Sequence, residues 1–314
     1  MRFAVLDLGT NTFHLLIAER EAVGQWRILW RDKRYVKLAE EGIEHIGDAP
    51  FARGLAALQA FKAQLDAHGV APAAVRAFGT AALRTASNAP AFLAQAFALT
   101  GIRPEIIPGD QEATLIYRGV RQAVPFPDHR VLIMDIGGGS VEFIIADRTR
   151  VLWQKSFPLG VAVLYRAFHH HDPITSMEME RLEAFLEAAL ADLWAALGQF
   201  PAPTLVGASG TFDVIDLFVL DPATKAKLYG YIELPAFEPL YHRLISSTVA
   251  ERRMMPKLPE ERVEMVVVAM VLIRYVLRRA GIREIYTSAY AMKEGMLAEL
   301  AGGAPGPGAR KPHP

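Results

Sequence analysis

Residues 131–147, VLIMDIGGGSVEFIIAD, place an aspartate, three glycines and a serine between two apolar stretches. A similar stretch, FAVLDLGTNTFHLLIA, occupies residues 3–18. The two align without a gap and pair Asp7 with Asp135, Gly9 with Gly137 and Thr12 with Ser140. Because the copies start 128 residues apart, they indicate a duplicated domain rather than a solenoid repeat.

The composition limits the class of protein. The chain has 314 residues, of which 52% are hydrophobic and 22% charged, typical of a globular protein with room for two domains. The 34 Lys and Arg residues balance the 34 Asp and Glu residues, and this zero net charge argues against a protein that coats nucleic acid. The absence of cysteine excludes disulfides and thiolate metal sites.

Nothing in the sequence predicts export or membrane insertion. The N-terminus, MRFAVLDLG, runs into a strand pattern without the features of a signal peptide. The longest apolar run, residues 263–277, contains Glu264 and Arg274 and is shorter than the ~20 apolar residues that span a membrane. We therefore expect a soluble cytoplasmic protein with neither nucleic acid nor a membrane as partner. The same run would suit either the core or a homodimer interface.

The repeats organise the rest of the chain. Strand-like stretches at 26–30 and 150–157 follow the two copies, so each half is expected to open as a three-stranded antiparallel meander. Further helix and strand patterns lie at 52–68, 75–88, 90–100, 105–120, 175–198, 204–218, 260–280, 282–290 and 291–300. Thr175 and Glu178 predict a capping box, and Gly198 the end of that helix. The basic pair Arg252-Arg253 fits an exposed helix end as well as an anion-guiding surface.

These patterns predict an N-terminal domain at 1–124, a C-terminal domain at 125–301 and a disordered tail at 302–314. The last helix of the second domain is free to pack back on the first.

Turns of small residues between strands expose backbone N–H groups that bind phosphate oxygens. One copy alone would equally fit an ordinary hairpin in which aspartate caps the turn, but two matched copies favour a phosphate site. A carboxylate beside phosphate requires a bridging divalent cation, so Mg²⁺ is the expected partner of Asp7 and Asp135. A third turn, GASGT at 207–211, adds Ser209 and Gly210. The predicted phosphate-binding residues of the two repeats are Gly9, Thr10, Asn11, Thr12, Gly137, Gly138, Gly139 and Ser140.

The motifs resemble those of a known family. Duplicated DLGTNT and DIGGGS turns are similar to those of the actin-like, heat-shock chaperone and sugar-kinase ATPase superfamily, which implies an α/β fold of two ribonuclease-H-like domains with mixed sheets and an interdomain cleft. Within it, the chain closely resembles the exopolyphosphatase/guanosine pentaphosphate phosphohydrolase family, in its short form. The motifs that carry this resemblance, in order, are DLGTNTFHLLIAE, GTAALRTASN, GDQEATLIYRGV, DIGGGSVEF, PLG, GASGT and SAYAMKEG.

The resemblance implies roles for single residues. Glu112, in GDQEA, stands where the family activates the attacking water. Gln111 replaces a second acid there, so we expect Glu112 to stay ionised easily, with no like charge beside it. Arg84 matches an arginine that reaches the phosphates, and Glu142 a carboxylate near the metal, whose counterpart in the first repeat is His14. In the family, arginine is commoner at the positions of Lys293 and Val163. These two departures leave open which length of polyphosphate the protein would prefer.

The combined interpretation is an exopolyphosphatase that releases terminal phosphate from inorganic polyphosphate, processively or stepwise. Mg²⁺, with or without a monovalent cation, would be held by some of Asp7, Asp135 and Glu142. Guanosine pentaphosphate, cleaved at its 5′ end, is the alternative substrate. An ATP-using kinase or chaperone-type ATPase, and a non-catalytic sensor of an alarmone nucleotide, are the other classes considered.

Overall fold

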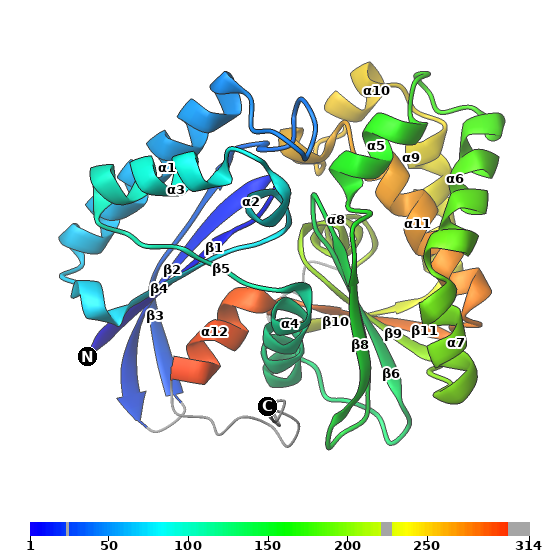
Figure 1. The fold of residues 1–314 in the computed structure, drawn as a ribbon. Helices are drawn as coiled ribbons and strands as arrows, with labels where there is room; N and C mark the ends of the chain where they lie inside the picture. Colours follow the sequence, from blue (N-terminus) through cyan, green and yellow to red (C-terminus); the bar gives the residue numbers. More distant parts are fainter. Residues whose placement is uncertain (23–24, 221–227, 301–314) are drawn as a thin grey trace, which may run out of the picture.

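The chain forms two mixed β-sheets flanked by helices (Figure 1). The computed structural model describes residues 1–22, 25–220 and 228–300, and the predicted tail lies outside the described residues. The strand order is β3-β2-β1-β4-β5 in the first sheet and β10-β11-β9-β6-β7-β8 in the second. The strands are β1 (Arg2–Leu8), β2 (Thr12–Ala22), β3 (Gln25–Tyr35), β4 (Val75–Gly79), β5 (Glu105–Ile106), β6 (Val131–Ile136), β7 (Val141–Ala146), β8 (Val151–Phe157), β9 (Thr204–Ala208), β10 (Tyr229–Glu233) and β11 (Glu284–Ser288).

Both halves open in the same way. The strand β2 pairs antiparallel with β1 and β3, as β7 does with β6 and β8. A parallel strand then joins each first strand, β4 beside β1 and β9 beside β6. The predicted meanders and the duplicated α/β fold are therefore confirmed.

Helices fill the remaining layers. They are α1 (Asp48–Ala67), α2 (Ala81–Thr85), α3 (Ala89–Thr100), α4 (Gly109–Ala123), α5 (Val161–Phe168), α6 (Ser176–Ala189), α7 (Ala191–Gln199), α8 (Gly210–Val219), α9 (Leu234–Ile245), α10 (Val249–Arg253), α11 (Val266–Arg279) and α12 (Met292–Leu300), with 3₁₀ turns η1 (Pro72–Ala74) and η3 (Glu260–Arg262). Sequence patterns did not predict α5, β10, α9 and α10, which are short or lie between stronger signals.

Three apolar cores hold the sheets and helices together. The first sheet packs on α1 and α3, and the second on α5, α6, α8, α9 and α11. The third core lies between the sheets, where α4 and α12 run side by side (Figure 1) and α12 also packs on β1. The last helix thus contacts elements of the first half of the chain, while the division into domains at residue 124 stays a prediction.

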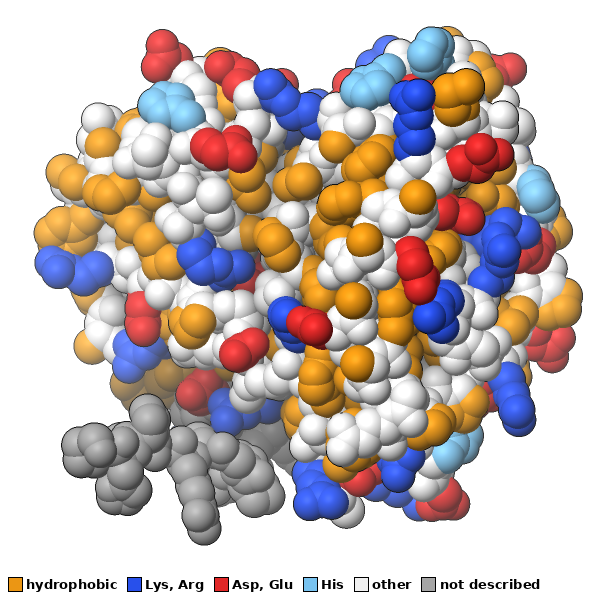
Figure 2. Space-filling model, turned by 45° about the vertical axis from the view of Figure 1, so that its right-hand side comes forward, with side chains coloured by type: hydrophobic (Ala, Val, Ile, Leu, Met, Phe, Trp, Pro, Cys, Tyr) orange, Lys and Arg blue, Asp and Glu red, His pale blue; other side chains and the backbone are white. Residues whose placement is uncertain are grey.

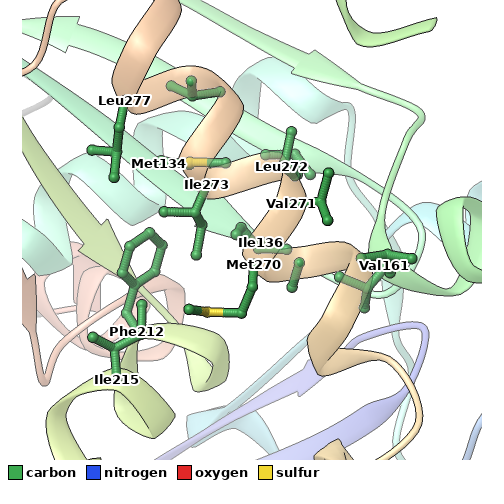
Figure 3. Packing of buried hydrophobic residues seen from close by; sticks show 14 of the residues in the cluster. Met134, Ile136, Val161, Phe212, Ile215, Met270, Val271, Leu272, Ile273 and Leu277 are labelled. Carbon is green, nitrogen blue, oxygen red and sulfur yellow. The ribbon is translucent and has the colours of Figure 1, made fainter. Parts of the chain in front are cut away.

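The apolar run at 263–277 belongs to the core. Its helix α11 buries Met270, Leu272 and Ile273 against β6 and α8 (Figure 3). This burial removes the run as an argument for a homodimer, which stays a prediction without that support. Among the residues that the structure describes, no helix is both long and apolar enough to cross a membrane. Figure 2 shows side chains of both charge signs interspersed over one face, in keeping with the balanced composition.

Two sequence interpretations are corrected. The helix predicted at 175–198 breaks at Leu190, which is fully buried, and Gly198 lies inside α7. Across the break, the Trp194 indole donates a hydrogen bond to the carbonyl of Glu187 (3.2 Å). The predicted capping box of Thr175 and Glu178 is present. Arg252 does not lie at an exposed helix end, because its side chain is fully buried.

Candidate active site

The two repeat turns have the same geometry. The amide of Gly9 donates to the Thr12 carbonyl (3.1 Å), and the amide of Gly137 donates to the Ser140 carbonyl (2.9 Å). In each repeat the aspartate pairs in register with the residue two positions after the turn, Asp7 with His14 and Asp135 with Glu142. The duplication therefore extends to the local backbone.

The turns also touch each other across the two halves. A Cβ atom on Gly138 would lie 2.7 Å from Cγ of Asn11, and one on Gly139 would lie 2.6 Å from Oγ1 of Thr10. A side chain at either position would have to displace these neighbours. Gly138 and Gly139 thus let the second turn lie against side chains of the first turn.

A cavity of about 270 Å³ opens where the turns meet. It takes in every predicted site residue except Arg84, and both His14 and Glu142 face it, as strand alternation predicted. The predicted residues that line it are Asp7, Gly9, Thr10, Asn11, Thr12, Glu112, Asp135, Gly137, Gly138, Gly139, Ser140, Glu142, Ser209, Gly210 and Lys293.

Buried carboxylates form the floor of the cavity. Glu142 is 1% exposed and Asp135 is 6% exposed. Burial raises the pKa of Asp135 to about 6, and burial together with the charge of Asp135 raises the pKa of Glu142 to about 7. Burial also raises the pKa of Asp7 to about 7, against the opposing effect of Lys293. Burial, which removes the carboxylates from water, is the largest cause of all three shifts.

The matched position in the first repeat has the opposite character. Burial, assisted by the positive charges of Lys293 and Arg262, lowers the pKa of His14 to about 3. The ring is therefore neutral at physiological pH.

Glu112 lies in the first turn of α4 with Arg84 beside it. Arg84 donates to the Ile107 carbonyl (2.7 Å), and its Nη1 lies 3.5 Å from Oε2 of Glu112. Burial raises the pKa of Glu112 well above its ordinary value, and the charges of Glu142 and Asp7 raise it further. The expectation that Glu112 has no like charge nearby is therefore wrong. Its acidic neighbours come from other strands, not from its own motif.

The side chain of Ser209 connects the third glycine-rich turn to Asp135 on the floor of the cavity. Ser209 has a φ of 71°, a region that favours glycine, and its hydroxyl donates to Asp135. Strained residues of this kind cluster at functional sites, where surrounding contacts hold them.

Comparison with known proteins agrees with this geometry. The sequence profile of the Ppx/GppA phosphatase family matches residues 16–303. The chain belongs to this family. The predicted family and the predicted fold are therefore confirmed.

Individual Ppx/GppA relatives extend the comparison. The crystal structure of an exopolyphosphatase from Cytophaga hutchinsonii superposes with a TM-score of 0.92 at 37% identity, over 96% of this chain and 98% of that one. A family member from Aquifex aeolicus has the same fold, with a TM-score of 0.78 at 24% identity, over 96% and 97% of the two chains. The guanosine-5'-triphosphate,3'-diphosphate pyrophosphatase of Aeromonas hydrophila is 28% identical over 306 residues, which are 96% of this chain. The chain spans only 59% of the length of that curated relative.

The carboxylates fit a magnesium ion that phosphate helps to hold. Among the described residues, no three His, Asp or Glu side chains lie close enough together to hold a metal by themselves. Mg²⁺, however, is commonly bound by one or two carboxylates, with water and substrate phosphates completing its octahedron. Asp135 and Glu142, paired across β6 and β7, offer such oxygen ligands.

Several cavity residues escaped the sequence analysis. Arg262, from the η3 turn, lies against the third loop, where a Cβ on Gly210 would be 2.5 Å from its Cζ atom. Lys33, Glu261, Asp213 and Thr80 also line the cavity. Arg262 lies 52 positions from Gly210 in the chain, so no local sequence signal could have revealed the contact.

Proposed function

We propose that this protein releases the terminal phosphate of inorganic polyphosphate, with Glu112 activating the attacking water. The observation that carries the proposal is the meeting of a buried glutamate with glycine-rich turns from both halves in one cavity. The similarity to a solved exopolyphosphatase over nearly its whole chain supports the choice of substrate.

The mechanism assigns each group a task. Backbone amides of the turns at 9–12 and 137–140 bind the terminal phosphoryl, and the carboxylate of Glu112 takes a proton from water. A carboxylate with a raised pKa is a stronger base than an ordinary one, and Arg84 favours its ionised form. The water oxygen bonds to phosphorus, the bridging P–O bond breaks, and orthophosphate leaves a chain one unit shorter.

Positive charge stabilises the transition state. Lys293 and Arg262 line the cavity and would offset charge that develops on the phosphoryl oxygens. When bound, Mg²⁺ supplies further charge neutralisation and would be held by Asp135 and Glu142, with Asp7 close by. Arg84 contacts Glu112 rather than the cavity, so we assign it to the base and not to the phosphate.

Guanosine pentaphosphate is the second candidate substrate. It carries the same terminal phosphoanhydride, and a relative is named for an activity on this nucleotide. A kinase or ATPase is disfavoured by the phosphatase family match, and a sensor by the presence of each carboxylate that the mechanism requires.

The test is orthophosphate release from long-chain polyphosphate and from guanosine pentaphosphate, each with Mg²⁺. Glu112→Gln should lose about 10²–10⁴-fold in kcat, the usual contribution of a general base. Asp110→Asn is the matched control, because it removes an exposed carboxylate from the same helical turn. Equal activity of wild type and Glu112→Gln would exclude Glu112 as the base. An inert wild type would leave the kinase and sensor alternatives.

A further inference from the structure

Two ion pairs join the end of the first meander to the segment before α11. The Nζ atom of Lys33, on β3, lies 2.7 Å from Oε1 of Glu261. The Nζ atom of Lys37 lies 2.8 Å from Oε2 of Glu264. Each pair connects the two halves of the chain, across 228 and 227 sequence positions.

The two pairs differ in their relation to the cavity. Lys33 and Glu261 both line it, whereas Lys37 and Glu264 do not. The Lys33 side chain is 62% exposed, in contrast to the nearly inaccessible Glu142 on the floor, so the first pair lies at the rim. The Lys37 side chain is only 22% exposed, and its pair is a structural link beside the opening.

We propose that the pair of Lys33 and Glu261 is an exchangeable contact at the rim that determines the preferred length of the anionic substrate. In the free protein Glu261 neutralises Lys33. A phosphate chain that extends from the floor to the rim takes the ammonium group for itself and displaces Glu261. A short anion reaches only the floor and gains nothing from Lys33. This inference rests on the proposed phosphohydrolase function and names a specificity determinant for it.

The physical chemistry favours exchange over a fixed bridge. A lysine ammonium is a compact charge on a flexible stem, which can change partner without moving the backbone. Burial alone would raise the pKa of the Glu261 carboxyl, but the hydrogen bond from Lys33, a backbone hydrogen bond and the charges of Lys33 and Arg262 together hold it below its usual range, so the carboxylate is charged when the anion arrives. Partly exposed pairs are weak, and a multiply charged chain is a stronger partner than one carboxylate.

The experiment measures binding of long-chain polyphosphate and of tripolyphosphate by calorimetry. A Glu112→Gln background prevents consumption of the anion. Lys33→Gln should weaken long-chain binding about two- to five-fold, the scale of a partly exposed ion pair, and tripolyphosphate binding less. Glu261→Gln should tighten long-chain binding by a similar factor. In the Lys33→Gln background, Glu261→Gln should tighten long-chain binding less than it does alone, because only the charge of Arg262 then remains for Glu261 to offset.

The control is Lys37→Gln, which breaks the neighbouring link without removing a cavity residue. It should leave the ratio of long-chain to tripolyphosphate affinity unchanged. Three results would overturn the proposal: no tightening by Glu261→Gln, equal tightening with and without Lys33, or a Lys37→Gln variant that behaves like Lys33→Gln. If wild type hydrolyses polyphosphate but the Lys33 and Glu261 variants bind it with unchanged affinity, the exchange proposal fails and the proposed function stands. If these variants change the affinity but wild type hydrolyses nothing, the proposed function fails and the exchange proposal stands.

Discussion

The contact between α4 and α12 gives the most direct test of how the site is positioned. Gly119 of α4 and Gly295 of α12 face the backbone of the opposite helix. A Cβ on Gly119 would lie 2.8 Å from the carbonyl carbon of Ala291, and one on Gly295 would lie 2.7 Å from that of Leu115. Carbon atoms in contact normally stay about 3.5–4.0 Å apart, so Gly119→Ala must separate the helices by about 1 Å.

This separation should cost both stability and activity. Overpacking costs about 1–3 kcal/mol, and a clash with rigid backbone belongs at the upper end of that range. Because α4 carries Glu112 and α12 carries Lys293, a shift of about 1 Å at the site should lower kcat by about 10²-fold. Urea unfolding and orthophosphate release measure the two effects.

Gly198→Ala is the matched control. This glycine also lies in a helix, but within the described part of the chain nothing outside its own neighbours and helix backbone lies within 4 Å of its added Cβ. Its replacement should leave kcat unchanged and stabilise the protein by about 0.5–1 kcal/mol. If Gly119→Ala matches wild type in both stability and kcat, the two helices do not set the position of the base.

Three further outcomes are expected. Arg252→Met leaves the buried carbonyls of Val263 and Ser247 without their donor and should lower the free energy of unfolding in urea by about 2–5 kcal/mol. Arg253→Met changes an exposed neighbour and should lower it much less. Equal losses in the two variants would contradict the buried role of Arg252. Burial alone would raise the pKa of Glu178, but hydrogen bonds from the Thr175 and His170 amides and from His171 hold it below its usual range. Glu178 therefore stabilises the fold at pH values above its unfolded pKa of about 4.3, and this contribution is lost as the pH falls further. Glu178→Gln should be less stable than wild type at pH 7, and the two stabilities should converge in acid. A difference in unfolding free energy that stays constant with pH would contradict this. Asp135→Asn should raise the Mg²⁺ concentration for half-maximal phosphate release, whereas an unchanged requirement would remove Asp135 from the metal site.

The repeat made much of the fold predictable. Matching Asp7 to Asp135 assigned both meanders, and the family resemblance implied an interdomain cleft; the structure brings both turns to one cavity. The capping box at Thr175 was also readable, since it depends on residues three apart.

The errors concern contacts between distant segments. The sequence around Glu112 shows an amide neighbour, whereas the folded chain brings Glu142 and Asp7 to it from other strands. The sequence around Arg252 is typical of a surface helix end, whereas in the folded chain its side chain donates to the carbonyl of Val263. Helix propensity alone would extend the 175–198 helix, but the burial of Leu190 and the hydrogen bond from Trp194 to the Glu187 carbonyl accompany a break.

The two repeats share a backbone conformation, but one pair of matched positions differs in charge. The two sides of the cavity therefore differ in charge as well. At matched positions the second repeat has the carboxylate of Glu142 and the first has the neutral ring of His14. Two carboxylates would repel a phosphate chain from both sides, and two neutral rings would offer no ligand to a cation. With one of each, Glu142 adds a second oxygen ligand beside Asp135, whereas His14 adds no negative charge beside Asp7. Duplication therefore explains why two matched turns meet at the cavity, and divergence explains why more of the carboxylates that we propose as ligands of Mg²⁺ come from the second repeat.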